Sequence, residues 1–119
     1  MNQGAIMDSF TTFEQITVGN SARNLVVCDV DLDDIIPEYL EKKRVECLQL
    51  RELVNVAACE EICGIAHGMR GSGGCYGFQG ISEIGASMES AAKAADLHGV
   101  LAQVVMLEAY LDCLDVCYE

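Results

Sequence analysis

Residues 58–74 read ACEEICGIAHGMRGSGG, and this stretch sets the expectation for the fold. Its apolar side chains Ile62, Ile65, Ala66 and Met69 recur at the spacing i, i+3, i+4 and i+7. That spacing places all of them on one face of an α-helix. The sequence therefore predicts a helix over about residues 58–74 that buries this face in a core.

The segments on both sides of this helix repeat the same periodicity. One helix is predicted to begin near Pro37, where a missing N–H costs little, and to end near Val56. The apolar positions are Ile36, Leu40, Cys47, Leu50 and Val54 in that helix, Ile81, Ile84, Gly85, Met88, Ala92 and Ala95 in a third, and Val100, Val104, Leu107, Leu111, Leu114 and Tyr118 in a fourth. Short links make consecutive helices antiparallel. We therefore expect an all-α protein, an up-down antiparallel four-helix bundle with a short N-terminal lead-in.

The length of 119 residues suits one domain with a single core. Residues 1–30 show no clear helical periodicity, so we expect a flexible N-terminal extension there, with any β-structure confined to this lead-in. The bundle is then expected to occupy residues 31–119. It would begin after the helix-capping carboxylates of Asp31, Asp33 and Asp34.

The composition is strongly acidic. Asp and Glu total 19 against 7 Lys and Arg, which gives a formal net charge of -12. Phosphate backbones and anionic membrane surfaces would repel such a chain, so we expect neither nucleic acid nor a membrane as partner. No apolar run is long enough to span a bilayer, and the start lacks the features of a secretory signal. These observations predict a cytoplasmic protein.

The predicted second helix is unusually rich in glycine. Each interior glycine costs roughly 1 kcal/mol relative to alanine, so some function should offset the cost. An arc of about 120° on the helix surface holds Gly64, Gly68, Gly71 and Gly74. His67 lies inside that arc, where another protein's backbone can approach a largely neutral, nucleophilic imidazole. Arg70, at i+3, would stabilise an anion attached there, most obviously a phosphoryl group.

The residues around His67 carry a family signature. Residues 66–78 read AHGMRGSGGCYGF. They resemble the signature of histidine-containing phosphotransfer (HPt) domains, in which Ala-His is followed after two residues by Lys-Gly-Ser, and by a glycine ten residues after the histidine. Arg70 stands where the family usually has lysine, and Gly77 is the later glycine. The resemblance extends over about residues 30–119 and implies that the histidine is exposed on the second helix of the bundle.

The resemblance carries over to further positions. Glu89 matches the acidic or amide residue that hydrogen-bonds the histidine, and Lys93, one turn later, matches a basic position found in some members. A Glu89 carboxylate that accepts from Nδ1–H would leave Nε2 free to attack; the alternative is a surface ion pair of little energetic consequence. Ser72 would either hydrogen-bond locally or touch a bound phosphate. Gly77 would end the helix, because positive φ costs glycine nothing.

A phosphorelay carrier is the function that the resemblance implies. His67 would accept a phosphoryl group from the aspartyl phosphate of a receiver domain or from a histidine kinase, and pass it to a response-regulator receiver. The sequence offers no glycine-rich nucleotide loop between a strand and a helix, so we expect no cofactor of its own. Mg²⁺ would belong to the receiver, and the chain would be a phosphocarrier without enzymatic activity.

The cysteines, 7 in number, leave other interpretations open. Their odd number and helical context indicate reduced thiols that pack as small apolar residues. Candidate ligands of a metal-binding or redox bundle, besides His67, are Cys59 and Cys63 in the second helix and Cys113 and Cys117 in the fourth, each pair spaced i, i+4. A dimerising bundle, or a docking protein that is not phosphorylated, is a third alternative. His98 is expected to be an exposed loop residue.

Overall fold

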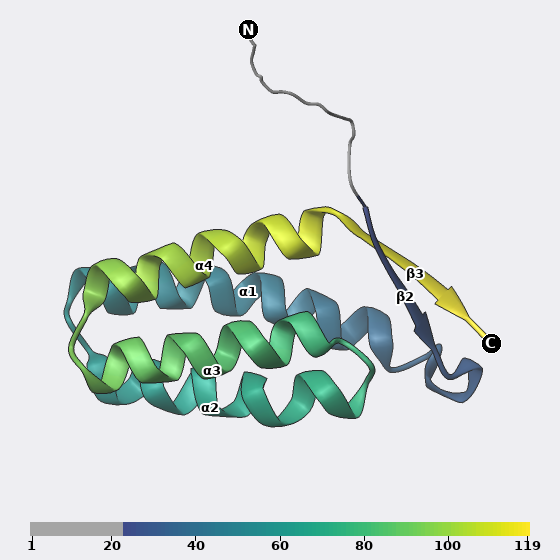
Figure 1. The fold of residues 1–119 in the computed structure, drawn as a ribbon, viewed down its shortest axis with the longest axis horizontal. Coiled ribbons are helices and arrows are strands. Elements are labelled where there is room, and N and C mark those ends of the chain that lie inside the picture. The colour runs from purple at the N-terminus through teal and green to yellow at the C-terminus, as the bar shows by residue number, and fades with distance from the viewer. Residues whose placement is uncertain (1–22) are drawn as a thin grey trace, which may run out of the picture.

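A computed structural model describes residues 23–119 of the chain. The α-helices of this part are α1 (Ile36–Asn55), α2 (Cys59–Cys75), α3 (Gln79–Lys93) and α4 (Leu97–Asp112). Successive helices run in opposite directions and pack against one another, and α4 closes the bundle against α1 (Figure 1). The predicted up-down four-helix bundle is therefore confirmed.

The helices α1, α2 and α3 all end in the same kind of turn. The second residue beyond each helix has a positive φ, 55° at Ala57, 93° at Gly77 and 55° at Ala95. The next N–H then reaches back five residues, as from Phe78 to the carbonyl of Gly73 at 2.8 Å. Gly77 ends α2 as predicted, whereas alanine adopts the strained left-handed conformation at the other two turns.

The apolar spacing predicted the core-facing side of α2 and its neighbours. Ile62, Ala66 and Met69 are fully buried, and Ile65 is partly buried against the same core. Phe78, directly after the turn at Gly77, is also fully buried and anchors the start of α3. These contacts fix α2 against α3 along the length of both helices.

Lys43, which interrupts the apolar pattern of α1, nevertheless belongs to the buried face. The residue is 5% exposed. Its ammonium lies 2.7 Å from Glu46 Oε1 and 4.9 Å from the centroid of the Tyr39 ring. A lysine is tolerated here because its apolar stem packs in the interior while its charge is paired.

The chain closes with a strand instead of a longer fourth helix. β3 (Leu114–Tyr118) follows α4 and pairs in parallel with β2 (Asn24–Cys28). The predicted continuation of the fourth helix through Leu114 to Tyr118 is therefore wrong, and so is the confinement of β-structure to the lead-in. Leu114, Val116 and Tyr118 fit a strand by their alternation, and in this strand they pack against the core.

The folded part also begins before the expected boundary at residue 31. Val26 and Cys28 of β2 are buried, and a short 3₁₀ helix spans Val30–Leu32. The structure thus differs from the expected flexible extension at residues 24–30, because pairing with β3 holds them in the fold. Residues 1–22 of that expected extension lie outside the described residues. Between residues 23 and 119, no helix has the length and apolar character needed to cross a membrane.

Candidate functional site

His67 lies on the outer side of α2, at the edge of the contact with α3. Its neighbours Ala66 and Met69 point into the core and are fully buried. The His67 side chain itself is 65% exposed. The helical period therefore presents the imidazole to solvent from a rigid, well-packed helix.

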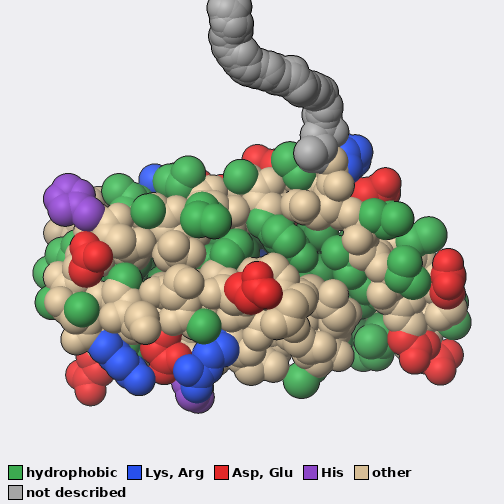
Figure 2. Space-filling model, in the orientation of Figure 1, with side chains coloured by type: hydrophobic (Ala, Val, Ile, Leu, Met, Phe, Trp, Pro, Cys, Tyr) green, Lys and Arg blue, Asp and Glu red, His purple; other side chains and the backbone are tan. Residues whose placement is uncertain are grey.

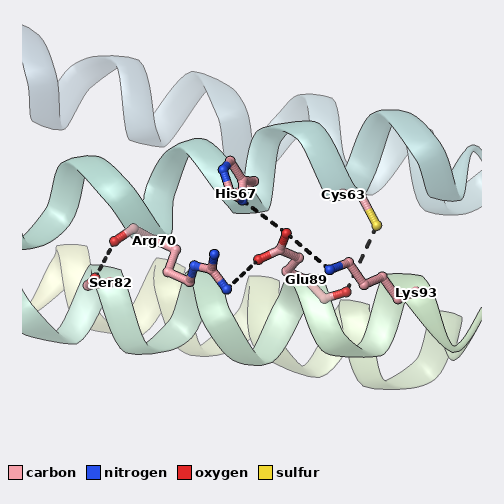
Figure 3. Close-up of polar contacts among 6 residues, drawn as sticks. All are labelled: Cys63, His67, Arg70, Ser82, Glu89 and Lys93. Carbon is pink, nitrogen blue, oxygen red and sulfur yellow. Dashed lines mark hydrogen bonds and ion pairs between the residues drawn. The ribbon is translucent and has the colours of Figure 1, made fainter.

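The imidazole faces a carboxylate on the neighbouring helix. Glu89 of α3 is only 7% exposed, and its Oε2 lies 3.0 Å from His67 Nδ1. Two cations approach the same carboxylate: Arg70 Nη1 lies 3.1 Å from Oε1, and Lys93 Nζ lies 3.6 Å from Oε2 (Figure 3). The structure thus brings His67, Arg70, Glu89 and Lys93 together at one point between α2 and α3.

The surroundings of Glu89 keep its carboxyl ionised. Burial raises the pKa of this carboxyl, but the hydrogen bond with His67 and the charges of Arg70 and Lys93 lower it by more, and the pKa lies below the ordinary value of 4.5. An ionised carboxylate can only accept, so Nδ1–H of His67 donates the hydrogen bond. Nε2 then carries the free lone pair of the exposed imidazole.

Arg70 and Lys93 give this edge of an acidic protein a local excess of positive charge. Their side chains are 50% and 67% exposed, and both face the single carboxylate of Glu89. Three other basic residues have a carboxylate each, Lys43 with Glu46, Arg44 with Asp112 and Arg51 with Glu108. Figure 2 shows basic and histidine side chains gathered along the edge formed by α2 and α3. An anion attached to the imidazole would find cations on both sides.

The glycines nearest to His67 leave the helix surface bare. A Cβ atom added at Gly64, Gly68 or Gly71 would meet no atom within 4 Å. Packing within the described residues therefore does not require glycine at any of the three. The open surface lies one turn before and one turn after the imidazole, as the sequence predicts.

Three other predicted binding residues lie away from the imidazole. Ser72 Oγ lies 2.8 Å from the hydroxyl of Tyr39 on α1, a hydrogen bond between two helices and not the local bond that was one of the two alternatives. Gly74 lies about two turns beyond His67, and Gly77 forms the turn to α3 beside the backbone of Val27. We therefore assign Ser72 and Gly77 a structural role in the fold.

The cysteine pairs do not form a metal centre. Cys59 and Cys63 lie in the first turns of α2, whereas Cys113 follows the last turn of α4 and Cys117 lies in β3. Because α2 and α4 run in the same direction, the two pairs lie at opposite ends of the bundle. Among residues 23–119, no group of three or more His, Cys, Asp or Glu side chains is placed to hold a metal ion.

Two further residues contact this site: Gly85, which was not a candidate, and Cys63, which was a candidate only as a metal ligand. The thiol of Cys63 donates to the backbone carbonyl of Glu89 at 3.9 Å. Gly85, one turn before Glu89, lies directly against the backbone of α2. Gly85 lies in the apolar stripe of the third helix, and a glycine at such a position indicates a close contact with a neighbouring helix. His98 is exposed as predicted, but it lies in the first turn of α4 and not in a loop.

Comparison with known proteins adds no family to these observations. No family model, curated protein or solved structure matches the chain.

Proposed function

We propose that this chain is a histidine phosphotransfer protein of a two-component phosphorelay. His67 accepts a phosphoryl group from a receiver-domain aspartate or a histidine kinase, and a response-regulator receiver then takes it. The observation that carries the proposal is the 3.0 Å contact between His67 Nδ1 and Glu89 Oε2, which leaves Nε2 of an exposed imidazole as nucleophile. The likeness of residues 66–78 to the HPt signature supports the same function.

In the proposed step, the Nε2 lone pair attacks the phosphorus of the aspartyl phosphate. A P–N bond forms, the P–O bond breaks, and the receiver's aspartate leaves as a carboxylate. The ring keeps its proton on Nδ1 and becomes a cation as Nε2 is phosphorylated. The Glu89 carboxylate, already hydrogen-bonded to Nδ1–H, stabilises that ring charge without reorganising. The reverse step passes the phosphoryl group to the next receiver.

Arg70 and Lys93 are proposed to bind the oxygens of the transferred group. The Arg70 side chain is 50% exposed and the Lys93 side chain is 67% exposed, and Glu89 holds each of them near His67. A phosphoryl group brings up to two negative charges, which compete with Glu89 for these cations. The planar guanidinium of Arg70 allows two parallel hydrogen bonds to phosphoryl oxygens, which the ammonium of a lysine does not.

The proposed reaction takes its components from two proteins, this chain and a receiver domain. The chain supplies the nucleophile, the cations and an open helix surface, and the receiver supplies Mg²⁺ and the acceptor aspartate. The open surface at Gly64, Gly68 and Gly71 lets a receiver's backbone come close to the imidazole. We propose a phosphocarrier that acts in the cytoplasm, without a cofactor of its own.

The test is transfer from phosphorylated receiver domains in the presence of Mg²⁺. Wild type should gain acid-labile, base-stable phosphate, and His67→Gln should gain none while keeping its helical circular dichroism. His98→Gln is the matched control, because it removes the other, exposed histidine and should label like wild type. Arg70→Ala and Lys93→Ala should label more slowly. Full labelling of His67→Gln would refute the proposal.

A further inference from the structure

The backbones of α2 and α3 come into close contact beside the phosphoacceptor. A Cβ atom added at Gly85 of α3 would lie 2.7 Å from the backbone nitrogen of Arg70, 2.9 Å from the carbonyl oxygen of Ala66 and 2.9 Å from Met69 Cβ. Two of these atoms belong to backbone, which cannot move aside as a flexible side chain can. No residue with a side chain fits here at the present helix spacing.

The residues in this contact flank the two members of the hydrogen bond. Ala66 directly precedes His67, Arg70 follows one turn later, and Glu89 lies one turn beyond Gly85 on α3. The distance between the two backbones at Gly85 therefore sets how far the Glu89 carboxylate is from the imidazole. The hydrogen bond of 3.0 Å depends on that distance.

We propose that Gly85 is a positioning residue of the site, which holds His67 as its Nδ1–H tautomer by letting α3 approach α2 closely enough for Glu89 to accept. The consequence for phosphotransfer rests on the proposed function, whereas the effect on the imidazole does not. Relief of the contacts in Gly85→Ala requires the helices to separate by roughly 0.5–1 Å, since non-bonded carbon atoms prefer about 3.5–4.0 Å. That separation takes the hydrogen bond beyond its usual range.

A second glycine of the same helix interface separates positioning from general packing. A Cβ atom at Gly73 of α2 would lie 2.6 Å from the backbone nitrogen of Ser82 and 2.8 Å from the carbonyl oxygen of Phe78. This contact is as close as that at Gly85, but it lies six residues beyond His67, about 9 Å along the helix. Gly73→Ala should therefore strain the interface equally and leave the imidazole unchanged.

The measurement is the ¹⁵N NMR spectrum of the His67 ring in the full-length protein. Wild type should show Nδ1–H, and Gly85→Ala should shift toward a mixture of both neutral tautomers. Glu89→Asp retracts the carboxylate by one methylene without changing the helix contact, and should shift the spectrum in the same direction. Gly73→Ala should give the wild-type spectrum, with a loss of thermal stability similar to that of Gly85→Ala.

A rate measurement with phosphoramidate, a small phosphoryl donor, completes the test. Its phosphoryl group passes to Nε2 as its P–N bond breaks and ammonia leaves. Gly85→Ala should be slowed by roughly tenfold to hundredfold, and Gly73→Ala should stay near the wild-type rate. A wild-type tautomer in folded Gly85→Ala, or an equal shift in Gly73→Ala, overturns the inference.

The two proposals fail in different ways. If Gly85→Ala does not fold, a wild-type tautomer in Glu89→Asp overturns the inference, because the tautomer would not then depend on the reach of the carboxylate. If wild type takes no phosphate from any donor, the proposed function fails, and the ring spectra still decide whether Gly85 positions the imidazole.

Discussion

At the scale of single residues, the Glu89 carboxylate organises the site. It accepts the hydrogen bond of His67 and faces the charges of Arg70 and Lys93 while it is 7% exposed. Removing this carboxylate would leave two cations without their shared partner and the imidazole without an orienting acceptor. Glu89 therefore pairs with the two surface cations and also fixes which nitrogen of the imidazole carries the proton.

The lowered pKa of the Glu89 carboxyl predicts a pH dependence of folding. A carboxyl whose pKa is lower in the folded protein adds stability above its ordinary value of 4.5, and this stability is lost as the pH falls through the lowered pKa. Urea unfolding followed from pH 7 to pH 3 should show a steeper loss below about pH 4.5 in wild type than in Glu89→Gln. The control Glu83→Gln, at an exposed position of α3, should follow wild type. Parallel curves for wild type and Glu89→Gln would contradict the prediction.

At the scale of elements, α2 combines two kinds of glycine. Gly73 accommodates the backbone of the next helix, whereas Gly64, Gly68 and Gly71 border open space. The first kind serves the fold. The second kind weakens the helix and gains no packing among the described residues, which agrees with the proposed docking of a receiver on this surface.

Alanine at the open glycines should therefore stabilise the protein. Gly64→Ala, Gly68→Ala and Gly71→Ala should each raise the free energy of unfolding by about 1 kcal/mol, because alanine is the better helix former and meets no atom within 4 Å. Phosphoryl transfer from a receiver should become slower, since methyl groups now cover the surface beside His67. Chemical denaturation and transfer rates measure the two effects. Lower stability in all three variants would mean that these positions contact the rest of the chain.

The strand β3 shows how an element depends on its partner. Leu114, Val116 and Tyr118 alternate as in a strand, but Leu114 and Tyr118 also continue the helical stripe of α4, so periodicity alone does not separate the two structures. The pairing with β2 decides that these residues form a strand. It bonds the backbone of Glu119 to that of Cys28 at 2.9 Å, between residues 91 positions apart in the chain.

At the scale of the whole molecule, the seven cysteines should differ widely in reactivity. Cys75 and Cys117 are exposed, whereas Cys28 and Cys47 are buried. Burial is the main cause that raises the pKa of Cys47 to about 11, so its reactive thiolate is scarce at neutral pH. Alkylation of the reduced protein at pH 8, followed by peptide mass spectrometry, should modify Cys75 and Cys117 first and Cys28 and Cys47 last.

Unfolding provides the control for these thiols. In concentrated denaturant all cysteines should react at similar rates, because the differences come from burial in the bundle. If Cys47 in the folded protein reacts as fast as Cys75, the packing of α1 against α4 differs from that described.

Local chemistry is sufficient to predict α2, α3 and the exposure of His67. Apolar side chains such as Ile62 and Met69 recur at the helical period, and this period also decides which face a histidine between them takes. The approach of Glu89 and Lys93 to that histidine was expected from the resemblance to HPt domains, and periodicity alone did not predict it. The turn at Gly77 was predictable because glycine accepts a positive φ, which Ala57 and Ala95 adopt without any such signal.

Contacts between distant parts of the chain decide the rest. The strand pairing of residues 114–118, the hydrogen bond of Ser72 with Tyr39 and the approach of α3 to α2 at Gly85 each join residues from different elements. A pattern within one segment does not contain them, because their energy comes from a partner that only the folded chain brings near. The imidazole is thus presented by local helix periodicity, but its orientation is set by the packing of two helices.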